Sequence, residues 1–405
     1  GVAGRVNALL VDLVLLLHRG DHRVEELEIA VALVVVASCL DGKRDAAGVV
    51  AEIKAQLKVE IKEEEVEAVV RDLDQHLILD SDLARVRRME LEREFEDLAV
   101  RPVRFVPGTR EEVAAQLDGY YTSKSGAGKP GEKRQAPLSG ILAPHIDFQR
   151  GGSCYSFAYR ELAERSDADL YVILGVAHLS PPNPFVVTSK SYETAFGIAE
   201  TDREAVAALE KRVGKRIFEH ESVHRGEHSA EFQAAFLKHA RPEGKFTVLP
   251  ILCSAFERWC GDASPSTAPE VEEFLGALRE VTAGRKVCIV AGVDFAHVGP
   301  VFGDEVDIDK KLMDWMMKGD TQGLQILAAG DAEAFWTSVM ADGNQRHVCG
   351  LSATYAAMRL LDRPEGKVHR YGFAPDPGGG VVSFASMSFS PRSKNMPWLV
   401  RASLT

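Results

Sequence analysis

Five short segments carry the side chains that could bind a metal ion or transfer a proton. They follow apolar runs or begin predicted helices, and they cover Leu142–Asp147, Ile173–His178, Gly226–Glu231, Gly292–His297 and His347–Gly350. Imidazole and thiolate groups are good ligands for iron, copper and zinc, and catalytic sites with open positions commonly combine three such groups. Cys349 begins a predicted helix, and a helix N-terminus favours the thiolate form that binds metals. Together the segments predict a metal centre.

Each segment also has a purely structural interpretation. A single histidine at a strand end is more often a hydrogen-bonded structural residue, Asp294 could cap a helix, and Glu231 could pair with His228 to hold a helix start. The segment Glu227–Glu231 lacks the spacing of a zinc-protease helix, and a Gly-x-Ser-x-Gly segment is absent. The metal hypothesis therefore depends on the five segments lying together.

From Arg101 onward, short apolar runs alternate with amphipathic segments and Gly/Pro turns, which is typical of α/β proteins. The predicted strands are 139–144, 170–175, 185–188, 246–252, 287–293, 369–373 and 381–389. The predicted helices are 110–120, 154–163, 202–213, 230–240, 271–282, 306–317, 332–339 and 351–361. Open α/β sheets bind ligands at the carboxyl ends of their strands, so this order would gather the five segments at one edge.

Residues 1–100 have a different composition, rich in Val, Leu, Glu and Arg and without proline. Helical spacing predicts helices over 46–57 and 63–77, a short strand at Leu77–Leu79, and a charged helix over 83–98. This order resembles small winged-helix-like modules. We therefore divide the chain into an N-terminal winged-helix-like docking module (1–100) and an α/β domain (101–405).

Charge argues against nucleic acid as the partner of the N-terminal module. The helix that would read DNA begins with Glu63, Glu64 and Glu65, which would repel phosphate. The whole chain has 48 Lys and Arg against 60 Asp and Glu, a formal net charge of −12. A docking or dimerising role is the better interpretation.

The composition is that of an ordinary globular protein, with 45% hydrophobic and 27% charged residues in 405. The six cysteines form no Cys-x-x-Cys pair, which favours reduced thiols in a cytoplasmic protein. The apolar stretches 6–17 and 29–40 are shorter than the ~20 residues of a membrane-spanning helix. The first also lacks the features of a signal peptide. We expect no association with a membrane.

The five segments, in this order and with these intervals, resemble the Memo family, also called AmmeMemoRadiSam system protein B. The segments that carry the resemblance read APHIDFQRGG, LGVAH, EHSAEFQ, VDFAH and HVCG, and the similarity covers roughly residues 101–389. The resemblance implies a fold related to class III extradiol dioxygenases, which is an α/β/α sandwich around a mixed sheet.

The resemblance also implies a metal site of two histidines and one cysteine. Matched segment by segment, the ligands fall on His145, His178 and Cys349. The acidic and basic residues that would surround the metal and act in catalysis fall on His228, Glu231, Asp294 and His297. In this assignment His297, positioned by Asp294, donates or accepts a proton, while His228 and Glu231 form a second acid–base pair or orient a ligand.

Two features depart from the family pattern or from the related enzymes. Leu179 stands where many relatives have a second histidine, and the first segment reads His-Ile-Asp-Phe rather than His-Ala-Gly-Tyr. Extradiol enzymes bind Fe(II) through two histidines and a carboxylate, so a cysteine in the third place means that ring cleavage does not follow from the fold.

Two functional hypotheses result. The first is a redox-active metalloprotein with one iron or copper ion, zinc being less expected, that carries out metal-dependent oxidation or oxygenation. The second is a non-catalytic protein that handles metal or binds a peptide, small molecule or protein partner. The family's system name implies radical-SAM and AMMECR1-like partners in a shared modification pathway.

Overall fold

The structure, a computed structural model, describes residues 36–392 apart from 38, 58–59 and 77. The chain divides into two compact units, Gly1–Glu94 and Phe95–Thr405, and the boundary falls in the last turn of helix α5 (Asp82–Glu96). The apolar stretch 6–17 and most of 29–40 lie outside the described residues.

The described part of the first unit is helical. Helices α3 (Ala46–Leu57) and α4 (Glu63–Gln75) pack against each other, as their apolar spacing predicted. The buried side chains of Val49 and Ile53 in α3 and of Val66 in α4 form a small cluster. Val36 and Cys39, which precede these helices in the chain, belong to the same cluster.

The strand expected at Leu77–Leu79 is not seen at its two described residues, Ile78 and Leu79. The Ile78 N–H donates to the Leu73 carbonyl at 2.9 Å, so this segment closes helix α4 instead of pairing as a strand. Leu77 lies outside the described residues, and the winged-helix topology stays a prediction.

A mixed eight-stranded sheet organises the second unit. The strands are β2 (Gly140–Ala143), β3 (Leu170–Val176), β4 (Phe185–Val187), β6 (Thr247–Cys253), β7 (Val287–Gly292), β8 (His297–Val298), β9 (Glu365–Asp376) and β10 (Gly380–Ser390). Their order is β4-β6-β3-β7-β2-β10-β8, and β9 pairs with β10. The four strands β6, β3, β7 and β2 are parallel, and the outer pairings are antiparallel.

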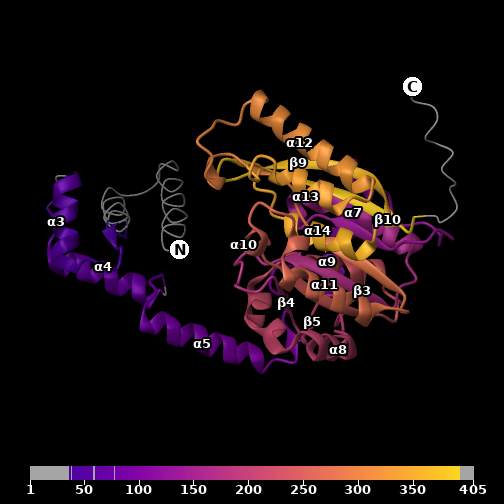
Figure 1. The fold of residues 1–405 in the computed structure, drawn as a ribbon, viewed down its shortest axis with the longest axis horizontal. Helices are drawn as coiled ribbons and strands as arrows, with labels where there is room; N and C mark the ends of the chain where they lie inside the picture. Colours follow the sequence, from indigo (N-terminus) through magenta and orange to yellow (C-terminus); the bar gives the residue numbers. More distant parts are fainter. Residues whose placement is uncertain (1–35, 38, 58–59, 77, 393–405) are drawn as a thin grey trace. The chain divides into compact units, whose positions relative to one another are not determined.

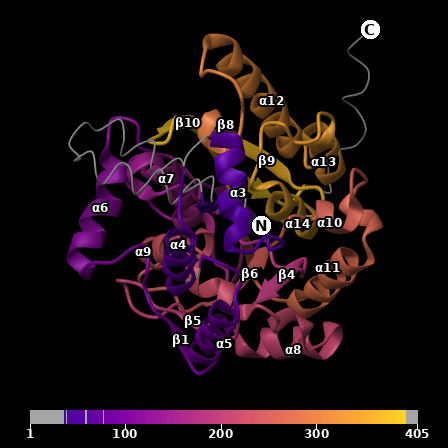
Figure 2. The same ribbon diagram turned by 90° about the vertical axis from the view of Figure 1, so that its left-hand side faces the viewer.

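Helices cover both faces of this sheet, which confirms the expected α/β class (Figure 1). Figure 2 shows α6 (Arg110–Thr122), α7 (Phe148–Arg165) and α9 (Ser229–Ala240) on one side, and α11 (Pro269–Thr282), α13 (Ala332–Met340) and α14 (Leu351–Leu361) on the other. The described residues of this unit also form α8 (Arg203–Val213), α10 (Glu257–Cys260) and α12 (Lys310–Ala328).

Strand β3 explains why two separate cores form. Its side chains alternate, so that Leu170, Val172 and Leu174 pack into one hydrophobic cluster. Tyr171 and Ile173 pack into the other cluster, on the opposite face. A strand buried on both faces reads as a continuous apolar run, which is the pattern that the sequence shows here.

The parallel pairing of β1 (Val100–Arg101) with β5 (Ser191–Tyr192) was not predicted. It joins the start of the second unit to a segment about 90 residues later. Within the part of the chain that the structure describes, there is no helix both long and apolar enough to cross a membrane.

Phe95 ties the end of α5 to the second unit, and its removal should destabilise that unit. The ring is fully buried, and the Lys190 ammonium lies 5.0 Å from its centroid. We expect Phe95→Ala to lower the free energy of unfolding by about 3–5 kcal/mol, because it leaves a cavity. Val86→Ala is the control, since Val86 on the same helix is 53% exposed.

Denaturant unfolding followed by tryptophan fluorescence measures this effect, because all four tryptophans follow Phe95 in the chain. An unchanged midpoint in Phe95→Ala would show that the second unit does not need this side chain.

Candidate metal centre

Three of the sequence-predicted side chains occupy equivalent positions at one edge of the sheet. His145, His178 and Asp294 each lie two residues beyond the end of a parallel strand, β2, β3 and β7 respectively. Because β7 pairs with both β2 and β3, these three positions are neighbours. The carboxyl edge of the sheet therefore assembles residues that are up to about 150 positions apart in the chain.

His145 is buried, and its surroundings fix its tautomer. Its Nδ1 lies 3.0 Å from the Gly292 carbonyl oxygen, which can only accept, so Nδ1 carries the proton and Nε2 keeps its lone pair. The backbone N–H of His145 donates to Asp294 Oδ1 at 3.0 Å. Burial, together with the nearby His178 and His228, holds the pKa of His145 well below its usual range. The imidazole is therefore a neutral donor.

Glu227 holds His178 in place. Its Oε2 accepts hydrogen bonds from the His178 backbone N–H at 3.1 Å and from His178 Nδ1 at 2.9 Å. Its Oε1 accepts from the Ser229 N–H at 2.9 Å. Burial would raise the pKa of Glu227, but these hydrogen bonds and the charges of His178 and His228 outweigh it and lower that pKa strongly. Because the ionised Glu227 carboxylate accepts a hydrogen bond from Nδ1 of His178, the other ring nitrogen, Nε2, faces away from Glu227.

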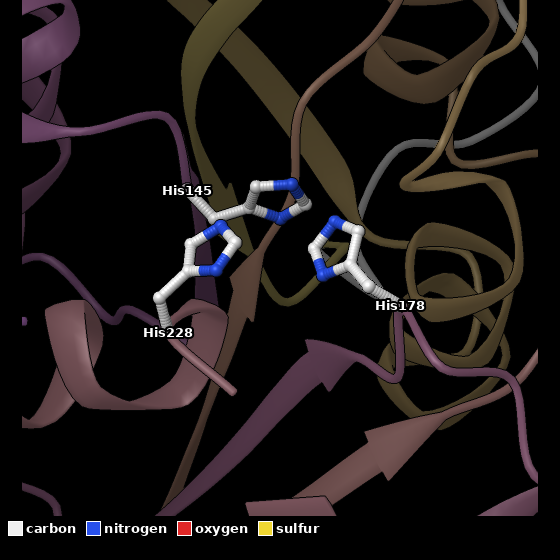
Figure 3. Close-up of side chains that lie close together, drawn as sticks. All are labelled: His145, His178 and His228. Carbon is white, nitrogen blue, oxygen red and sulfur yellow. The ribbon is translucent and has the colours of Figure 1, made fainter. Parts of the chain in front are cut away.

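His228 completes a cluster of three imidazoles. It immediately precedes helix α9, and its ring stacks on His178 with centroids 4.9 Å apart and an interplanar angle of 16°. One ring nitrogen of each of His145, His178 and His228 lies within 4.8 Å of the others, and the three rings point toward one another in Figure 3. Such a group can hold a metal ion.

Cys349, which lies just before helix α14 (Leu351–Leu361), contacts this cluster through His145. Its Sγ lies 3.3 Å from Nε2 of His145, and burial raises the pKa of the thiol well above its usual range when no ion is present. The next residue, Gly350, allows this approach. A Cβ on Gly350 would lie 2.5 Å from the Asp294 carbonyl oxygen and 2.6 Å from Val293 Cβ, so the start of α14 can touch the end of β7 only with glycine.

His297 lines a cavity of about 450 Å³ beside the cluster, and this cavity is also lined by His145, His178, His228, Phe232 and Asp294. Burial lowers the pKa of His297 to about 4 and raises the pKa of Asp294 to about 7.

The expected Asp294–His297 pair is replaced by other contacts. His297 Nδ1 bonds to the Phe295 carbonyl at 3.2 Å, and Asp294 bonds to His145.

Glu231 is directed away from the cluster into a structural network. One oxygen pairs with the Arg101 guanidinium at 2.7 Å, and the other accepts the backbone N–H groups of Arg104, Phe105 and Val106 at 2.7–3.0 Å. Both Arg101 and Glu231 are almost fully buried. The structure thus uses Glu231 to hold the segment that follows β1, whereas Glu227 of the same sequence motif faces the histidines.

Sequence reasoning missed two features of this region. Glu227 lies directly before His228, and that adjacency was the only available signal for its role. The residues His220–His224 do have the zinc-protease spacing His-Glu-x-x-His, but His220 precedes a 3₁₀ segment that contains the other four residues, so they form no α-helix. Both ring nitrogens of His224 are occupied, by the Tyr192 hydroxyl at 2.7 Å and the Val186 carbonyl at 3.0 Å, so this spacing is structural.

Comparisons with known proteins agree with the resemblance seen in the sequence. Residues 104–388 match the model of a family described as Memo-like protein. The chain is 26% identical to a MEMO1 family protein of Aquifex aeolicus, over 88% of this chain and 91% of that protein. It is 27% identical to MEMO1 family proteins of Methanopyrus kandleri, over 70% and 95%, and of Thermus thermophilus, over 76% and 87%.

The match to the Aquifex protein extends beyond the α/β unit. The match covers 88% of this chain, which is more residues than Phe95–Thr405 contains. The match therefore includes part of the N-terminal unit. Part of the N-terminal unit is therefore similar in sequence to that relative.

The buried ion pair of Arg101 with Glu231 should contribute to stability and not to metal binding. We expect Glu231→Gln to lower the free energy of unfolding by about 3–5 kcal/mol, because it leaves the Arg101 charge buried and unpaired. The double variant Arg101→Met/Glu231→Leu should recover part of that loss. Chemical denaturation measures both, and a loss of bound metal from a folded Glu231→Gln protein would instead assign Glu231 to the centre.

Proposed function

The chain belongs to the Memo-like protein family, and from this premise we propose that it binds one redox-active metal ion, iron or copper, through His145, His178 and Cys349. The observation that supports the proposal is the contact of the Cys349 thiol with His145, one member of the His145–His178–His228 cluster. A nitrogen and a sulfur ligand on one tetrahedral ion lie about 3.5 Å apart, given bond lengths of ~2.0–2.1 Å and ~2.3 Å. The observed 3.3 Å between His145 Nε2 and Cys349 Sγ fits this spacing.

The donor set favours a transition metal over a hard cation. Imidazole and thiolate ligands suit iron, copper and zinc, whereas calcium and magnesium require oxygen ligands. Bound iron or copper would supply one-electron redox chemistry at an open coordination position. The chain would thus act in metal-dependent oxidation or oxygenation, with the cavity of about 450 Å³ admitting the reactant.

The surrounding residues would orient ligands and move protons. Gly292 and Glu227 each hold the Nδ1 of one ligand histidine, which directs its Nε2 toward the ion. His297 is neutral at pH 7, because its pKa is lowered to about 4, and it faces the same cavity. It can therefore accept a proton there. His228 lies close enough to serve as a second proton-transfer group.

Metal content tests the ligand assignment. Protein purified without oxygen should contain about one equivalent of iron or copper by elemental analysis, and Cys349→Ser should lose most of it, because thiolate is the softest ligand. Cys260→Ser is the matched control at a partly exposed free cysteine and should keep the metal. His228→Ala and His297→Ala should keep the metal and lose turnover.

Other results would change the assignment. If Cys349→Ser keeps its metal while His228→Ala loses it, the ligands are the three histidines. Wild-type protein without stoichiometric metal would contradict the proposal altogether.

Glu227 should control metal affinity without touching the ion. We expect Glu227→Gln to weaken metal binding about 10- to 100-fold, because the amide holds the His178 ring less firmly and no longer favours its Nδ1–H tautomer. Glu219→Gln, at an exposed position nearby in sequence, should have no effect. Competition with a colorimetric chelator measures the affinity, and equal affinity in Glu227→Gln would remove Glu227 from the centre.

The second candidate is a protein that holds metal for delivery, or binds a partner, without turnover. A separate helical unit before the α/β unit favours this function, since such units commonly dock to other proteins. Oxygen consumption by the metal-loaded protein with a catechol-like or other reductant separates the two functions. Tight metal binding without oxygen consumption would support the second.

A further inference from the structure

A buried carboxylate outside the five sequence segments ties two parts of the centre together. Asp320 lies in the middle of helix α12 and is 1% exposed. Its Oδ1 pairs with the guanidinium of Arg346, which is also buried. Its Oδ2 accepts the Ser383 hydroxyl at 2.5 Å and the Tyr371 hydroxyl at 2.9 Å. Burial raises the pKa of this carboxyl, and the three donors oppose that shift.

Through Arg346 the carboxylate reaches the loop that carries Cys349. Arg346 lies three residues before Cys349, and its carbonyl oxygen accepts the His297 N–H at 2.8 Å. The N–H of Gly350, directly after the cysteine, donates to the Asp294 carbonyl at 3.2 Å. The loop is therefore held, on both sides of the thiol, against the segment that follows β7.

Through Ser383 the same carboxylate reaches that segment from strand β10. The Ser383 hydroxyl that donates to Asp320 also accepts the Ala296 N–H at 2.8 Å. The backbone of Ser383 pairs with the segment as well, because its N–H donates to the Ala296 carbonyl at 2.9 Å and its carbonyl accepts the Phe295 N–H at 2.8 Å. The hydrogen bonds thus form a closed ring that begins and ends at the carboxylate and passes through the loop and the segment.

Gly319 of helix α12 makes room for the Arg346 side chain. A Cβ on Gly319 would lie 2.6 Å from both Cζ and Nε of Arg346, which is too close for the guanidinium to stay in place. Glycine is less favourable than alanine inside a helix. Here the missing side chain lets the guanidinium reach Asp320.

We propose that Asp320 is a positioning residue of the centre, which holds the thiol of Cys349 at the histidine cluster by tying the Cys349 loop and the segment after β7 to one carboxylate. This inference rests on the proposed function, because it concerns the ligand Cys349. Asp320 does not line the cavity beside the cluster, so it acts through the backbone of these two stretches and not on a reactant.

Two variants of the full-length protein weaken this link. Asp320→Asn removes the charge that holds Arg346, and Gly319→Ala displaces the guanidinium although alanine is the better helix former. Gly276→Ala is the control for a helix glycine, because a Cβ there has open space. Tyr371→Phe is the control for the carboxylate, because it removes one hydrogen bond to Asp320 Oδ2 without touching the loop or the segment.

Two measurements follow the position of Cys349. The first is titration with Co(II) alone, in which the thiolate–Co(II) absorption band reports sulfur coordination and competition with a chelator gives the affinity. We expect both variants to bind Co(II) about tenfold more weakly and with an altered band, because the thiol is held less firmly. In the second, on metal-free protein, iodoacetamide should alkylate Cys349 about threefold faster in both variants, because the loop opens more often. The fully buried Cys288 should stay unreacted, and its alkylation would report general unfolding.

The outcomes separate positioning from a general contribution to stability. Both controls should match the wild type, and effects in Tyr371→Phe or Gly276→Ala equal to those in the two variants would overturn the inference. Wild-type Co(II) binding and alkylation in a folded Gly319→Ala protein would overturn it as well, and this variant decides alone if Asp320→Asn does not fold. If the wild type binds no metal, the function proposed above fails, while the alkylation of Cys349 still supports or overturns the role of Asp320.

Discussion

Parallel pairing of β2 and β3 with the strand between them, β7, is the constraint on which the rest of the centre depends. The register aligns Ala143 with Gly292 and Leu174 with Ala291, so the three strands end at nearly the same level. Side chains two residues beyond each end then meet at one edge. A register shift of one residue would turn each strand's side chains to the opposite face of the sheet. The apolar runs on both faces of β3 fix the register through the two hydrophobic cores.

Burial at this edge sets the chemical state of the histidines. Desolvation penalises the protonated form of an imidazole, and it is the largest cause of the lowered pKa of both His145 and His297. His178 is the exception, because the adjacent Glu227 carboxylate outweighs burial and raises its pKa. Burial also lowers the pKa of His228. Because His145 and His228 favour the neutral form, charge repulsion within the cluster is reduced, and each neutral ring keeps one lone pair.

The centre lies in the wall shared by two cavities of different character. One contains His228, His297 and Asp294 and suits proton transfer. The other is lined by Cys349, Cys253 and apolar side chains such as Val176 and Leu351. His178 borders both cavities.

The sequence by itself determined the α/β class, the family and the strand ends where His145, His178 and Asp294 stand, because strands buried on both faces leave continuous apolar runs. It also predicted the helices α3, α4 and α14 closely, since apolar spacing and turn residues are local signals. The roles of two glutamates of one motif were decided only by the tertiary structure. Glu231 points to Arg101 and Glu227 points to His178, because they project from different positions at the start of α9. Local sequence cannot specify such long-range partners.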